Sequence, residues 1–112
     1  MPYMPPYLIQ YVSVNATADG DNEIIAAVSG QQIRVLGYVL TATGVGNILV
    51  QNTAATPVVY GRIRSGGDGQ GAAYAGNQEA PAFETAVGTG IEINNPAGVD
   101  TLGHMTYMEV PG

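Results

Sequence analysis

The stretch from Gln32 to Thr43 constrains the fold of this chain more than any other, because it predicts a strand that is apolar on both faces. Successive side chains of a β-strand point to opposite sides. One face would carry Ile33, Val35, Gly37, Val39 and Thr41, and the other Arg34, Leu36, Tyr38, Leu40 and Ala42. An antiparallel strand with one face in water alternates apolar and polar residues instead. We therefore expect both faces to be covered, one by the opposite sheet of the chain and the other by a neighbouring subunit or larger assembly.

The β-branched residues of this strand indicate which face is which. Ile33, Val35 and Val39 suit a tightly packed sheet interior, because their side chains are stiff and fill a pleated surface well. We expect this odd-numbered set to face the core and the larger Tyr38 to face the partner.

The rest of the chain alternates short strand-like segments with Gly and Pro turns and shows no helical period. Further strands are expected over residues 8–16, 23–28, 47–52, 58–63, 82–86, 90–94 and 101–110. Residues 65–81 hold five glycines without apolar periodicity and predict a long loop. The pattern favours an all-β fold, a jelly-roll β-sandwich of about eight antiparallel strands. At this length residues 8–112 form a single domain.

The first seven residues, M-P-Y-M-P-P-Y, hold three of the chain's seven prolines. Proline lacks the amide donor that an inner strand or a helix interior needs, so residues 1–7 predict an extended N-terminal arm. The arm is either a frayed terminus or a capsid-docking segment that inserts Tyr3, Met4 and Tyr7 into a partner groove.

Composition narrows the range of partners. Charged residues make up only 11% of the chain, with nine acidic against three basic residues and no lysine or cysteine. A protein that binds phosphate backbones needs clustered Lys and Arg, so nucleic acid and anionic membranes are excluded as partners. There is also no apolar run of 18 residues and no signal-peptide pattern, so we expect a soluble, unprocessed chain.

Catalytic groups are scarce. His104 is the single histidine, whereas a metal site of the double-stranded β-helix enzymes needs two histidines and a carboxylate. Ser13, Ser29 and Ser65 have no evident base beside them. We expect His104 to be structural, or a mild pH switch if it faces a subunit contact. The chain is therefore not expected to be an enzyme, and no catalytic or cofactor-binding residue is assigned.

Carboxylates cluster once, at Asp19, Asp21 and Glu23. Three acids on alternate positions could ligate calcium, which accepts irregular oxygen cages. Acids beside glycine are also the usual residues of a solvated turn, and this interpretation is the one we adopt. No metal ligand is therefore assigned.

Three segments suggest a family: Asp21 to Ala42 with I-R-V-L, Phe83 to Asn94 with F-x-T-x-x-G-x-x-I-x-I, and Gly103 to Val110 with G-H-x-T-Y-x-E-V. With these the chain, over roughly residues 8–110, resembles small virion proteins of tailed bacteriophages. They are similar to capsid decoration or cement proteins with a trimeric jelly roll like that of tumour necrosis factor. The motifs follow the core pattern, so they specify fold more strongly than role.

The resemblance implies a structural virion protein that binds the outer surface of the phage major capsid protein as a homotrimer and stabilises it. Such a protein is soluble in the host cytoplasm before assembly and then lies on the capsid surface. The subunit interface would use Tyr38, Leu40, Phe83 and Tyr107, because aromatic residues are enriched at interface cores. Each of these residues could instead fill the monomer core.

A second function remains open. The chain could be a receptor- or glycan-binding module of a tail fibre or head fibre, since jelly rolls also serve lectins. The 65–81 loop would then supply Tyr74, Asn77 and Gln78 as the sugar platform.

Overall fold

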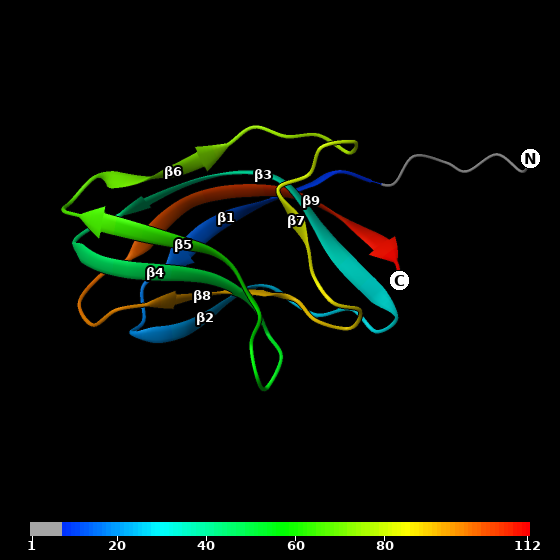
Figure 1. Cartoon of the computed structure of the whole chain (residues 1–112), viewed down its shortest axis with the longest axis horizontal. Coiled ribbons are helices and arrows are strands. Elements are labelled where there is room, and N and C mark those ends of the chain that lie inside the picture. The colour runs from blue at the N-terminus through cyan, green and yellow to red at the C-terminus, as the bar shows by residue number, and fades with distance from the viewer. Residues whose placement is uncertain (1–7) are drawn as a thin grey trace, which may run out of the picture.

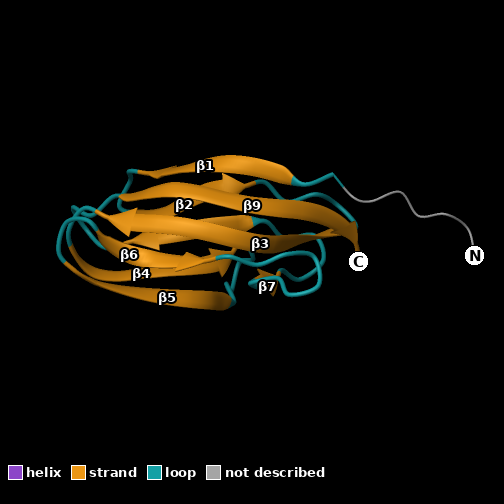
Figure 2. Ribbon diagram, turned by 90° about the horizontal axis from the view of Figure 1, so that it is seen from above, coloured by secondary structure: helices purple, strands orange, loops and turns teal. Residues whose placement is uncertain are grey.

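The computed structural model describes residues 8–112, which form two antiparallel sheets packed face to face (Figures 1 and 2). The strands are β1 (Gln10–Ala16), β2 (Gly20–Ile25), β3 (Gln31–Ala42), β4 (Val45–Asn52), β5 (Val59–Gly66), β6 (Gln70–Tyr74), β7 (Phe83–Glu84), β8 (Ile91–Asn95) and β9 (Thr101–Pro111). Residues 8–112 contain no helix, and hence none that could cross a membrane. The prediction of an all-β sandwich is confirmed. The expected arm, with Tyr3, Met4 and Tyr7, lies outside the described residues.

The two sheets divide the strands in an interleaved order. The first sheet runs β1-β9-β3-β6, with the short β7 also paired to β3, and the second runs β2-β8-β4-β5. The longest pairing joins β3 to β9 from Gln31 opposite Pro111 to Ala42 opposite Thr101. The stretch that the sequence singles out is therefore a central strand of the first sheet.

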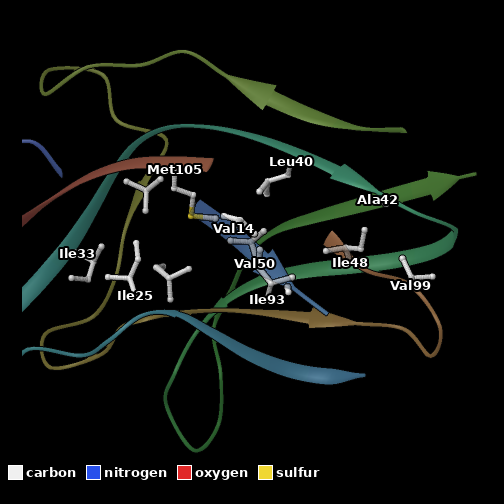
Figure 3. Packing of buried hydrophobic residues seen from close by; sticks show 13 residues of the cluster. Val14, Ile25, Ile33, Leu40, Ala42, Ile48, Val50, Ile93, Val99 and Met105 are labelled. Atoms are coloured by element: carbon white, nitrogen blue, oxygen red, sulfur yellow. The ribbon is translucent and has the colours of Figure 1, made fainter. Parts of the chain in front are cut away.

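The core fills the space between the two sheets. The first sheet contributes Val14, Ile33, Val35, Leu40 and Met105, and the second contributes Ile25, Ile48, Val50, Ile91 and Ile93. Figure 3 shows several of these side chains pointing toward one another from opposite ribbons. Each is at most 4% exposed, and burying one such side chain stabilises the fold by roughly 1.5–3 kcal/mol. The fully buried part of the core is thus aliphatic.

A β-bulge interrupts β3. Val35 lies opposite Tyr107 and Gly37 lies opposite Thr106, so Leu36 is an extra residue without a partner on β9. An extra residue shifts the two-residue alternation by one. The strand therefore turns odd-numbered side chains inward before the bulge and even-numbered ones inward after it.

The bulge corrects the expected orientation of β3. Ile33 and Val35 face the core as predicted, but Val39 is 41% exposed and Tyr38 packs against the core cluster. Strict alternation in the sequence assigns Val39 to the same face as Ile33 and Val35, because it does not detect the extra residue Leu36.

A second correction concerns residues 65–81, which are not all loop. β6 lies within them and pairs with the end of β3, with Tyr38 opposite Tyr74 and Thr41 opposite Gly71. A Cβ atom at Gly71 would lie 1.8 Å from the Leu40 carbonyl oxygen, so glycine is required for this close approach. The glycines that make this segment resemble a loop in the sequence also allow β6 to pair closely with β3.

Candidate functional site

The outer face of the first sheet carries no carboxylate or guanidinium over most of its area. We call this surface the neutral face. It consists of Tyr11, Ser13 and Asn15 of β1, Leu102, His104 and Thr106 of β9, Val39 and Thr41 of β3, and Ala73 of β6. One row crosses all four strands, from Ser13 through His104 and Val39 to Ala73. The Arg34–Glu84 ion pair, at 2.7 Å, lies beyond it at the other end of β3.

Large apolar side chains are exposed on the neutral face. Tyr11 is 76% exposed, Val39 41% and Leu102 37%. Next to them Ile9, Tyr11 and Leu36 line a groove of about 490 Å³ together with Asn77 and Gln78. This side of the molecule therefore exposes apolar area, with Glu79 also lining the groove beside it.

The outer face of the second sheet is acidic over β2 and β8, while Arg62 and Arg64 lie on the same face at the edge strand β5. Asp21, Glu23 and Glu92 lie on neighbouring strands, with Glu23 directly opposite Glu92. The Gln51 side-chain amide donates to both Glu92 and Asp21, and the Asn94 amide donates to Asp21 at 2.6 Å. The two amides therefore partly offset the clustered negative charge.

The three acids considered for calcium do not converge. Asp19, just before β2, accepts a hydrogen bond from the Gly98 amide at 2.9 Å, whereas Glu23 lies on β2 opposite Glu92. Within residues 8–112 no three His, Cys, Asp or Glu side chains are close enough to share a metal ion.

A cavity of about 450 Å³ opens between β5 and β6, the strands that end the two sheets on one side. We call it the edge cavity. Its aromatic lining is Tyr38, Tyr60, Tyr74 and Phe83, and its charged lining is Arg62 and Arg64. Gly61 and Ala72 also line it, and such small side chains leave room for a ligand.

The rings of the edge cavity are held in place. Tyr60 and Phe83 stack with centroids 4.8 Å apart, and Tyr38 lies 6.4 Å from Tyr74. The hydroxyl of Tyr60 accepts a hydrogen bond from the Asn52 amide, and the hydroxyl of Tyr74 donates to the Ala80 carbonyl. The cavity walls are therefore fixed by contacts within the chain.

The four side chains expected at a subunit interface lie elsewhere than on the neutral face. Leu40 is 1% exposed and faces the second sheet, so we remove it from the interface. Tyr38 and Phe83 line the edge cavity, and Tyr107 packs against the core. These aromatic side chains are partly buried and pack against an otherwise aliphatic core.

Sequence reasoning missed the exposed apolar residues of the neutral face. Alternation within β1, where Val12, Val14 and Ala16 point inward, would have placed Tyr11 outside. No comparable signal existed for Val39, because its orientation depends on the bulge.

The suggested sugar platform is split by the structure. Tyr74 lines the edge cavity, whereas Asn77 and Gln78 line the groove beside Tyr11. Asn77 also accepts hydrogen bonds from the amides of Glu79 and Ala80, both at 2.9 Å, which fixes the turn. These three residues do not share one cavity.

The phenol of Tyr107 has a displaced pKa. Burial, and secondly the Glu109 carboxylate, raise the pKa of Tyr107 above its usual value of 10.0. Its hydroxyl donates a hydrogen bond to Gln10 at 3.2 Å, which ties β9 to β1. The protonated phenol of Tyr107 therefore stabilises the first sheet.

Taken together, the described chain is a two-sheet β-sandwich with a neutral face, an acidic patch on β2 and β8, and a cavity at one edge. Comparisons with protein-family models, with curated proteins and with solved structures found no match for it.

Proposed function

We propose that this chain is a structural virion protein that binds the outer surface of a phage capsid as a homotrimer and stabilises it. The observation that supports this function best is the neutral face. A chain with a net charge of −6 repels its own copies, and they approach at least cost where the surface carries no charge. Covering Tyr11, Val39 and Leu102 would also remove apolar area from water.

We further propose that the sandwich is a jelly roll. The orders β1-β9-β3-β6 and β2-β8-β4-β5 are those expected when two Greek keys interleave. Viral capsid domains use this architecture. Together with the resemblance of the three core motifs to phage decoration proteins, the strand order supports a role in the virion.

The proposed trimer places the neutral face of each copy against the next one. A closed threefold ring uses a heterologous contact, in which two different patches meet. The groove of Ile9, Tyr11 and Leu36 continues the neutral face and provides a recess for the neighbour's side chains. Tyr3, Met4 and Tyr7, outside the described residues, are proposed to contact the major capsid protein.

The oligomeric state tests the trimer directly. Size-exclusion chromatography with light scattering should give a trimer for the wild-type chain. Tyr11→Glu combined with Leu102→Glu should give a monomer with an unchanged circular dichroism spectrum. Ala97→Glu adds a charge at an exposed turn and should leave the trimer intact. A wild-type chain that stays monomeric at all concentrations would exclude this assembly.

Binding to heads tests the virion role. Purified protein should bind capsids that lack it and raise their resistance to heat, and cryo-electron microscopy should show it on the outer surface. A variant without residues 1–7 should bind less. Unchanged occupancy of this variant would refute docking through the arm.

A second candidate is a receptor- or glycan-binding module of a tail or head fibre. The edge cavity supports it, because three tyrosines and a phenylalanine line a recess of ligand size. Immunolabelling of virions would distinguish the two candidates, since labelled heads without labelled fibres would exclude a tail-fibre module.

A further inference from the structure

We propose that the edge cavity binds an acidic sugar, a pyranose that carries a carboxylate. This inference deepens the second candidate and rests on it for the ligand class, but a head protein could carry the same site. Its support comes from four features of the cavity: size, aromatic walls, paired arginines and free strand edges.

The cavity has the size and the walls of a small-molecule site. Its volume of about 450 Å³ lies within the range of roughly 300–1,000 Å³ that such sites occupy. Tyrosine rings present flat, electron-rich faces on which the C–H groups of a sugar ring can pack. Because Asn52 holds Tyr60 and the Ala80 carbonyl holds Tyr74, little side-chain freedom is lost on binding.

The arginines give the cavity its charge preference. Arg62 and Arg64 are two of the three basic residues in the chain. They alternate on β5 with Gly61 and Ile63, which lie opposite the core residues Val50 and Ile48, so both arginines leave the strand on its outer side and line the cavity at its rim. The third, Arg34, is already paired with Glu84, and no carboxylate in residues 8–112 forms an ion pair with the other two. A guanidinium binds a carboxylate through two parallel hydrogen bonds. A positively charged rim on a chain of net charge −6 therefore selects an anion.

Free strand edges favour a sugar over an aromatic acid. Among residues 8–112, β5 pairs only with β4 and β6 only with β3, so the outer edges of these two strands carry backbone N–H and C=O groups without a sheet partner from that range. Sugar hydroxyls can hydrogen-bond to these groups, whereas an aromatic carboxylate would cover them and leave them unpaired. The cavity thus offers rings for one face of a pyranose, backbone groups for its hydroxyls and arginines for its carboxylate.

Gly61 allows the cavity to be filled without disturbing the core. A Cβ atom there would meet only the Cβ of Val50, at 3.9 Å, which is ordinary contact. Gly61 is also absent from the glycines with positive φ. Gly61→Leu should therefore place a side chain in the cavity while the strand keeps its pairing with Val50.

The experiment compares two matched ligands by titration, followed by NMR of backbone amides. Methyl glucuronide should cause saturable shifts at β5 and β6, with a dissociation constant on the order of 1 mM. Methyl glucoside, which lacks the carboxylate, should bind about tenfold more weakly. The Arg62→Gln, Arg64→Gln double variant should abolish this difference, Gly61→Leu should abolish binding of both, and Arg34→Gln should match wild type.

Several results would overturn the inference. Equal binding of the two ligands would reject the acidic sugar but leave the glycan-binding candidate intact. Binding that persists in a folded Gly61→Leu variant would place the site elsewhere. Binding of benzoate without glucuronide would indicate an aromatic acid, and the absence of saturable shifts with any sugar would reject both this inference and a sugar site in the cavity. None of these results depends on whether the chain forms a trimer.

Discussion

The rings of Tyr60 and Phe83 lie parallel to within 6°, and they join the edge strand β5 of one sheet to β7 of the other. This stack is the principal aromatic contact between the sheets at the open edge of the sandwich. It also forms one wall of the edge cavity. Its strength should therefore affect both the stability of the fold and the shape of the cavity.

Replacing Phe83 by Ala should lower the free energy of unfolding by about 2–3 kcal/mol, less than for a fully buried ring because Phe83 is only partly buried. Urea denaturation followed by circular dichroism measures the loss. A double-mutant cycle with Tyr60→Ala should give a coupling of about 0.5–1.5 kcal/mol. Val87→Ala, at a half-exposed site nearby in sequence, is the control and should change stability little. Additive effects at Tyr60 and Phe83 would show that the stack contributes nothing of its own.

Gly71→Ala should detach β6 from β3. The added Cβ would lie 1.8 Å from the Leu40 carbonyl oxygen, so the strands must separate, at a cost of about 3 kcal/mol. Hydrogen exchange should show lost protection for the amides of β6 while β9 stays protected. Gly67→Ala is the matched control, since a Cβ atom there meets nothing within 4 Å. Equal stability of the two variants would mean that the glycine is not required for the pairing.

Thr85→Val should destabilise the fold although the two side chains have nearly the same volume. The Thr85 hydroxyl accepts a hydrogen bond from the Ile33 amide at 2.9 Å and donates to the Thr89 carbonyl, and the side chain is 1% exposed. Valine would leave both backbone groups without this partner, at a cost of about 1–3 kcal/mol. Thermal or urea unfolding measures the change. Thr17→Val, at an exposed turn, should stay within about 0.5 kcal/mol of wild type.

Stability should fall at high pH through Tyr107. Its pKa is raised in the folded chain, so the unfolded chain loses the phenol proton first, near pH 10.0, and the contribution of this group is lost as pH rises through the folded-state pKa. Below pH 10.0 the contribution is fully present. Urea denaturation between about pH 9 and about pH 11 should show a smaller decline for Tyr107→Phe than for wild type. An identical decline in both proteins would contradict this role.

The sequence predicted most strands, but it missed β6 and misplaced the start of β2. Apolar runs such as those of β3, β8 and β9 were visible because their residues are β-branched or aromatic and are bounded by Gly or Pro. β6 was hidden, because a strand that approaches its neighbour as closely as Gly71 approaches Leu40 must be poor in large side chains. β2 begins at Gly20 rather than at Glu23, since Asp21 and Asn22, which precede the expected start of this strand, already pair with β8.

The surfaces were harder to predict than the fold, for a physical reason. Aromatic residues suit both a subunit contact and a core, and only the packing of the two sheets shows that Tyr38 and Phe83 point inward. The edge cavity depends on where β5 and β6 end their sheets, which is a property of the topology. Residues from five strands and from the loop between β6 and β7 meet there without any local sequence signal.

The bulge at Leu36 sets which residues of β3 face the core. Deleting this single residue would make Val35 opposite Tyr107 and Gly37 opposite Thr106 successive pairs, so that Val39 would stay outward and Leu40 inward in an uninterrupted ladder. Inserting one residue between Gly37 and Val39 would instead turn Leu40 toward solvent in the present register with β9. Conservative substitutions at the apolar positions of β3, and even the loss of Leu36, should therefore be tolerated far better than such an insertion.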